Sequence, residues 1–185
     1  MPANQKLFSV TNWLLKAASV FTVFIAAILA LVFAVLVLGL GALLFAPALL
    51  KPLNIPAVIH GVGLLPVLVA ALFAVFGGLV SIVLILLAIR ATSGIVDTAI
   101  AGDPFVAANA GRLNRIGCLL LGIMAVQFAT FLAVGVFAPD NNPNVHISGG
   151  SEPDPVGLLA ILLIFVLARI FQHGSAMRDE LESMV

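Results

Sequence analysis

The strongest constraint on this chain is a run of thirty-four residues, Ala17 to Leu50, that contains no charged side chain. About 20 helical residues cross the hydrocarbon core of a bilayer. Four runs are long enough to do so, at residues 17–44, 62–90, 116–137 and 155–173. The chain is 63% hydrophobic and 9% charged, whereas soluble domains carry about 25% charged residues. The sequence therefore predicts a single all-α integral membrane domain with four transmembrane helices in one bundle.

Glycine and proline predict where the helices end. Gly39, Gly41 and Pro47 mark the expected break at the end of the first span. Gly102 is a suitable residue to follow the last turn of a helix. Asp103 and Pro104 then suit the N-cap and first position of the next helix.

The basic residues predict the orientation. Both chain ends and the loop 91–115 fall on one side of four spans, and the loop 138–154 falls on the other. The first side collects seven basic residues and the second only Lys51; the seven are Lys6, Lys16, Arg90, Arg112, Arg115, Arg169 and Arg178. By the positive-inside rule, both termini, the middle loop and the tail 174–185 are expected in the cytoplasm, and 138–154 outside.

Several intramembrane residues predict helix packing. A stripe of small residues on the second span favours close approach of another helix, either inside the bundle or at a dimer seam; it comprises Ala70, Ala74, Gly77, Gly78 and Ser81. Gln127 is expected to hydrogen-bond across the bundle, and Cys118 to be a small buried residue. Arg169, at membrane depth, is expected to pair with Asp97 or Asp103.

The sequence predicts no catalytic, cofactor-binding or metal-binding residues. Net charge is zero, so no direct nucleic-acid binding is expected. No Asp or Glu lies inside a span, which argues against proton-coupled transport. An outer metal site of His60 and His146 with Asp140, Glu152 or Asp154 lacks close ligand pairs along the chain. We therefore expect no enzymatic activity.

Two segments resemble the bacterial domain-of-unknown-function-2975 family of four-span membrane proteins. The first is Gly102-Asp103-Pro104-Phe105 with Asn109, Leu113 and Ile116-Gly117. The second is the ending Phe171, Gly174, Met177-Arg178-Asp179-Glu180-Leu181-Glu182. Met177 stands where the family has leucine, and Ser183-Met184 replace its Gly-Thr. The resemblance implies a bacterial inner-membrane location and, by gene neighbourhood alone, a cytoplasmic helix-turn-helix regulator as partner.

The sequence is compatible with three functions. The first is a non-enzymatic membrane protein that acts as a regulatory or interaction partner through its cytoplasmic face. The residues expected on that face are Asp103, Pro104, Phe105, Asn109, Arg112, Arg115, Arg169, Phe171, Gly174, Arg178 and Glu180. The second is a channel or transporter subunit that works as a homo-oligomer. The third is an accessory subunit of a larger membrane complex.

Overall fold

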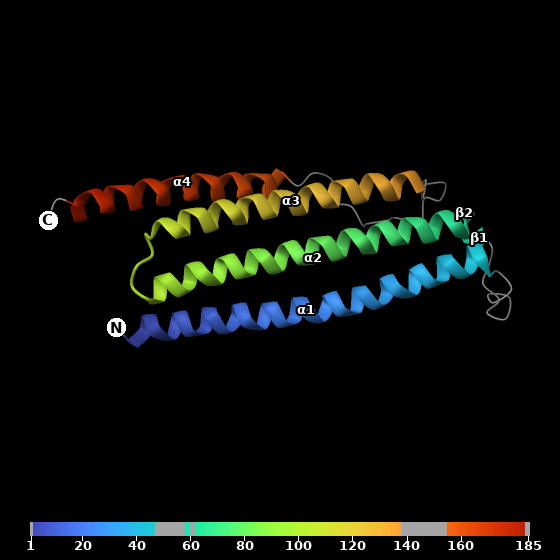
Figure 1. Cartoon of the computed structure of the whole chain (residues 1–185), viewed down its shortest axis with the longest axis horizontal. Coiled ribbons are helices and arrows are strands. Elements are labelled where there is room, and N and C mark those ends of the chain that lie inside the picture. The colour runs from blue at the N-terminus through green and yellow to red at the C-terminus, as the bar shows by residue number, and fades with distance from the viewer. Residues whose placement is uncertain (1, 47–57, 60–61, 138–154, 184–185) are drawn as a thin grey trace. The chain divides into compact units, whose positions relative to one another are not determined.

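The computed structural model describes residues 2–46, 58–59, 62–137 and 155–183. In this part of the chain the elements are α1 Pro2–Phe45, β1 Val58–Ile59, β2 Val62–Gly63, α2 Leu64–Ile100, α3 Ala107–Phe137 and α4 Pro155–Ser183 (Figure 1). All four helices are long and apolar enough to cross a membrane. The predicted all-α fold with four membrane-spanning helices is confirmed, and the side on which the termini lie stays a prediction.

Helix α1 is longer and more regular than predicted. It is continuous from Pro2 to Phe45, so the expected break at Gly39 and Gly41 is wrong. In lipid the backbone has no water to bond with, and the helical hydrogen bonds outweigh the modest cost of the glycines. The helix does end two residues before Pro47, which has no N–H to donate.

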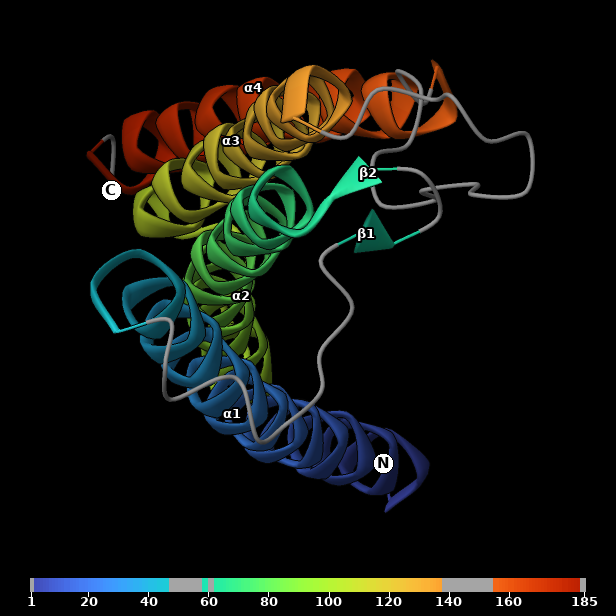
Figure 2. The same cartoon turned by 90° about the vertical axis from the view of Figure 1, so that its right-hand side faces the viewer.

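The connection between α1 and α2 contains a feature that the sequence did not predict. Strands β1 and β2 pair antiparallel, with Val58 opposite Gly63 and Ile59 opposite Val62 (Figure 2). Each strand has two residues, so this ladder adds four residues of β-structure to an otherwise helical chain. It does not change the fold class.

The helices expose most of their apolar surface. In the most hydrophobic stretch of α1 no residue is buried inside the protein, and in α2 only 17% are. Large side chains such as Phe21, Leu38 and Leu159 are more than half exposed. Soluble proteins rarely leave such wide apolar surfaces in water. The chain is therefore a multi-pass membrane protein whose helices present these faces to an apolar surrounding.

The internal contacts divide the described chain into two units. Unit 1 consists of Met1–Val23, Val83–Ile123 and Asp154–Val185, and unit 2 of Phe24–Ile82 and Met124–Pro153. Unit 1 thus contains the start of α1, the connection between α2 and α3, and all of α4. Unit 2 contains the remaining parts of α1, α2 and α3.

Unit 2 is held by small residues and aromatic pairs. Gly77 of α2 is buried against Thr130 of α3, and Gly78 faces Leu29 of α1. The ring of Phe73 stacks on Phe137 at 5.4 Å between centroids. Small residues let helix backbones approach closely, which is the main source of helix association in lipid. For Gly77 and Gly78, the predicted stripe therefore contacts helices of the same chain.

The burial predicted for Cys118 and the hydrogen bond across the bundle predicted for Gln127 are wrong. Gln127 and Cys118 of α3 are both exposed on the surface of the chain. The expectation relied on polarity and size alone. Apolar runs this uniform carry no periodicity that fixes which face of α3 points inward.

Candidate functional site

The connection between α2 and α3 begins with a regular helix stop. Gly102 has φ of +91°, in the left-handed region that costs glycine little. The N–H of Asp103 donates to the Thr98 carbonyl at 3.1 Å, and that of Gly102 to Ala99 at 3.2 Å. This is the Schellman pattern, which satisfies the last carbonyls of the helix. The prediction that α2 ends at Gly102 therefore has a direct structural cause.

The start of α3 differs from the prediction. Helix α3 begins at Ala107, so Asp103 and Pro104 lie in the preceding turn and are neither N-cap nor first helical residue. The backbone N–H of Asn109 donates to the Val106 carbonyl at 2.9 Å. Asp103 and Pro104 instead have tertiary partners, and these override their local preference.

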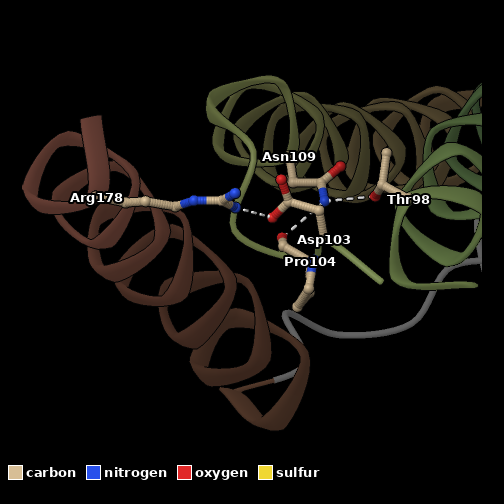
Figure 3. Close-up of polar contacts among 5 residues, drawn as sticks. All are labelled: Thr98, Asp103, Pro104, Asn109 and Arg178. Atoms are coloured by element: carbon tan, nitrogen blue, oxygen red, sulfur yellow. Dashed lines mark hydrogen bonds and ion pairs between the residues drawn. The ribbon is translucent and has the colours of Figure 1, made fainter. Parts of the chain in front are cut away.

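Asn109 is the central polar residue of this connection. Its side chain is completely buried, at 0% exposure. Its Nδ2 donates to the Thr98 hydroxyl at 2.7 Å and to the Pro104 carbonyl at 2.9 Å (Figure 3). Its Oδ1 accepts from Arg112 at 2.7 Å. Both amide protons and one acceptor site are thus used, as a buried amide requires.

Arg112 joins this amide to the side of α2. One terminal nitrogen, Nη1, donates both to Asn109 Oδ1 and to the Gly94 carbonyl, each at 2.7 Å. The Arg112 guanidinium packs against Gly94. A Cβ at position 94 would lie only 2.9 Å from Arg112 Nε, so a larger residue there would displace the arginine. We call these five residues, Gly94, Thr98, Pro104, Asn109 and Arg112, the Asn109 network. The network fixes the end of α2 to the start of α3.

Helix α4 attaches to the same connection by two contacts, which we call the α4 clasp. Asp103 forms an ion pair with Arg178, drawn in Figure 3. Phe105 stacks on Phe171 with 5.1 Å between ring centroids, and its ring lies beside Gly174. The clasp joins the end of α4 to the turn before α3.

The structure brings together eight of the eleven residues predicted for the cytoplasmic face. They are Asp103, Pro104, Phe105, Asn109, Arg112, Phe171, Gly174 and Arg178. Arg115 and Glu180 are exposed. Sequence reasoning missed Gly94 and Thr98, because a glycine and a threonine inside a helical run carry no signal of their tertiary partners.

The predicted pairing of Arg169 is wrong. Its Nη1 donates to Gln172 Oε1 at 3.2 Å, one turn along α4. Asp103 pairs with Arg178 instead. The middle loop and the tail do contact each other, as that hypothesis required, but through a basic residue nine positions further along the chain.

The Asp103–Arg178 ion pair is expected to add little stability. The two side chains are 35% and 47% exposed, and exposed pairs contribute about 0.2–1 kcal/mol. A double-mutant cycle of Asp103→Ala and Arg178→Ala, followed by thermal unfolding in detergent, should give a coupling free energy in this range. Asp97→Ala, which removes an exposed carboxylate near the end of α2, six residues before Asp103, is the control and should change stability by less. A coupling free energy above 2 kcal/mol would contradict this expectation.

An open groove lies between α3 and α4, next to the network and the clasp. Its volume is about 500 Å³. The α3 wall is made of small residues and one amide, and the α4 wall carries the polar side chains; the lining residues are Ala107, Ala110, Gly111, Asn114, Phe165, Ala168, Arg169, Gln172 and Ser175. We call it the α3–α4 groove.

The register of α2 and α3 places Arg90 at the same level along the helices as Arg115. Two contacts fix this register: Gly94 with Arg112, and Leu84 with Gly122. In an antiparallel pair, residues between these contacts face one another in reverse order. Arg90 therefore lies at the level of Arg115 and Ile116.

The other two helices bring basic residues to the same level. Lys16 of α1 and Arg90 of α2 line one groove. Arg169 of α4 lines the α3–α4 groove with Asn114, the neighbour of Arg115. We call Lys16, Arg90, Arg115 and Arg169 the basic belt. Each of the four helices thus carries one basic residue at this level. Such a level of basic side chains is expected where membrane helices cross the boundary between lipid and water.

No group suited to metal binding occurs in the described residues, where no three His, Cys, Asp or Glu gather. The residues of the possible outer metal site lie outside the described residues; they are His60, His146, Asp140, Glu152 and Asp154. His173 of α4 is exposed.

Comparison with known proteins assigns the family. The model of the family described as Protein of unknown function (DUF2975) matches residues 52–185. The chain belongs to this family. The match covers α2, α3 and α4 and both segments that carried the resemblance, so every residue of the Asn109 network and the α4 clasp lies within the DUF2975 region. No match was found among the curated proteins or the solved structures.

Proposed function

We propose that this DUF2975 protein is a non-enzymatic protein of the bacterial inner membrane that binds a cytoplasmic protein partner through the α3–α4 groove. The observation that carries the proposal is the position of the groove. Its α3 wall lies in the first DUF2975 segment, and Ala107, Ala110 and Gly111 in that wall flank Asn109, whose side chain is held by three hydrogen-bonding partners. Binding sites are commonly open grooves supported by a rigid scaffold.

The lining of the groove suits a helix of the partner. Ala107, Ala110 and Gly111 on the α3 wall permit close approach of a second backbone. Asn114 and Gln172 offer polar groups at the rim. A soluble helix-turn-helix regulator, which the family resemblance implies by gene neighbourhood, is the first partner to test.

The basic belt supports the orientation that this proposal requires. Positively charged residues concentrate at the cytoplasmic ends of membrane helices. Thr98 lies eight residues beyond Arg90, or about 12 Å along the helix. The Asn109 network and the Ala107 end of the groove would then stand beyond the cytoplasmic membrane surface, within reach of a soluble protein, while the Arg169 side chain of the groove would lie at the boundary.

Filling the groove should abolish partner binding without unfolding the protein. Gly111 lines the groove, is exposed and has open space where a Cβ would lie, so Gly111→Trp adds an indole to the groove from a position where a side chain can begin without a clash. We expect Gly111→Trp to reduce the recovered partner at least ~10-fold, since bulk in a binding groove costs 1–3 kcal/mol. The measurement is quantitative co-purification from native membranes.

Gly135→Trp is the matched control. Gly135 lies on the same helix as Gly111, is exposed and also has open space where a Cβ would lie. It does not line the α3–α4 groove. It should leave the recovered partner unchanged. Equal recovery with both tryptophan variants would reject the groove as the binding site, and recovery of no specific protein by the wild type would reject the proposed function.

A further inference from the structure

A second groove in unit 1 lies between α1 and α2. It has a volume of about 200 Å³. Lys16 and Ser19 of α1 face Arg90 and Ser93 of α2 across it. Two cations from different helices thus share one small opening, and this pair is separate from the α3–α4 groove.

The polar groups of this groove point to an anion. No acidic side chain is among its lining residues. Ser19 already donates its hydroxyl proton to the Lys16 carbonyl at 2.8 Å, and Ser93 donates to Ile89 at 3.0 Å. The hydroxyls therefore need no ligand, and the uncompensated charge is that of Lys16 and Arg90. Arginine and lysine together are suited to a phosphate group.

The rest of the lining is apolar. Leu15 and Val23 of α1 and Leu86 and Ile89 of α2 complete the groove. Val23 and Leu86 lie on the membrane-spanning side of the basic belt, away from the connection between α2 and α3. A ligand that fills the groove must therefore place a charged end between Lys16 and Arg90 and an apolar part along the helices.

We propose that the α1–α2 groove binds the phosphate headgroup of an anionic glycerophospholipid. Its phosphodiester contacts Lys16 and Arg90, and the start of an acyl chain lies on Leu86 and Val23. Basic pockets between transmembrane helices are suited to such headgroups. A free phosphate ion would gain from the two cations but not from the apolar wall.

Lys16 and Arg90 differ from Arg115 and Arg169, the other two residues of the basic belt, in their surroundings. Arg169 is already hydrogen-bonded to Gln172. Arg115 is exposed and does not line either groove. The site is therefore specific to Lys16 and Arg90 and is not a property of the basic belt as a whole.

The test is lipid binding by detergent-purified protein, measured by native mass spectrometry with dioleoylphosphatidylglycerol and dioleoylphosphatidylcholine. The wild type should bind the anionic lipid at least ~10-fold more tightly. Lys16→Gln and Arg90→Gln should each weaken that binding about 5-fold, the effect of one basic residue near an anionic surface. The double variant Lys16→Gln/Arg90→Gln should weaken it further, whereas Arg115→Gln/Arg169→Gln, which removes the same two charges at the same level, should leave the binding unchanged.

A neutral variant separates the site from effects of charge on membrane insertion. Ser19→Leu keeps every basic residue but fills the groove, and it should also weaken phosphatidylglycerol binding about 5-fold or more. Three results would overturn the proposal: equal affinity for the two lipids, equal weakening by the two charge-removing pairs, or displacement of the lipid by inorganic phosphate at equal concentration.

Discussion

Replacing Asn109 with leucine is expected to lower the free energy of unfolding by about 2–4 kcal/mol. The side chain is wholly buried and has three hydrogen-bonding partners, Thr98, Pro104 and Arg112. Leucine has similar bulk but leaves the Pro104 carbonyl without a donor and removes one acceptor from Arg112. A buried polar group that loses its partner costs about 1–3 kcal/mol.

Thermal unfolding in detergent, followed by size-exclusion chromatography after heating, measures this effect. A loss of 2–4 kcal/mol corresponds to a fall in Tm of about 5–15 °C for a chain of this size. Asn114→Leu is the matched control, since Asn114 is an exposed asparagine on the same helix, and its Tm should change by only a degree or two. If Asn109→Leu and Asn114→Leu unfold at the same temperature, the Asn109 network does not stabilise the connection.

Replacing Gly77 with leucine should also destabilise the protein, here in unit 2. A Cβ at this position would overlap the Thr130 hydroxyl and approach Thr130 Cβ and Cγ2 to 3.1 and 3.2 Å. The whole side chain of Thr130, not a flexible tip, occupies the space. Overpacking of this kind costs about 1–3 kcal/mol or more, and here it would also separate α2 from α3.

The Gly77 prediction can be tested by compensation. Thr130→Ala removes the overlapping hydroxyl, so the double variant Gly77→Ala/Thr130→Ala should have a higher Tm than Gly77→Ala alone. Gly135→Ala, at an open site on α3, should leave the Tm unchanged or raise it slightly, because alanine favours helix. Additive losses in the double variant would show that the two residues do not contact each other.

The sequence was sufficient for the four helices and for the end of α2. In lipid, the backbone N–H and C=O groups of an apolar run of more than 20 residues are all hydrogen-bonded within the run only if it is a helix. Gly102 marked the end of α2 because glycine adopts the left-handed conformation at little cost. The sequence was not sufficient for the start of α3. Asp103 and Pro104 have the local chemistry of a helix start, but Asp103 pairs with Arg178 and the Pro104 carbonyl binds Asn109.

The sequence also could not choose partners between helices. Arg169 and Arg178 lie nine positions apart on α4, and spacing along the chain does not say which of them reaches Asp103. That choice depends on the register of α4 against α3, which the packing of Phe165 on Gly117 sets. Glycines at helix contacts were recognised at Gly77 and Gly78, within a stripe, but not at the isolated Gly94.

The Asn109 network has a consequence for biogenesis. All its hydrogen bonds lie within residues 94–112, on α2, α3 and their short connection. A helical hairpin of α2 and α3 thus carries every partner that its buried amide needs. Because none of these hydrogen bonds involves α1 or α4, the α2–α3 hairpin can form them before α4 has been synthesised and whether or not α1 has docked.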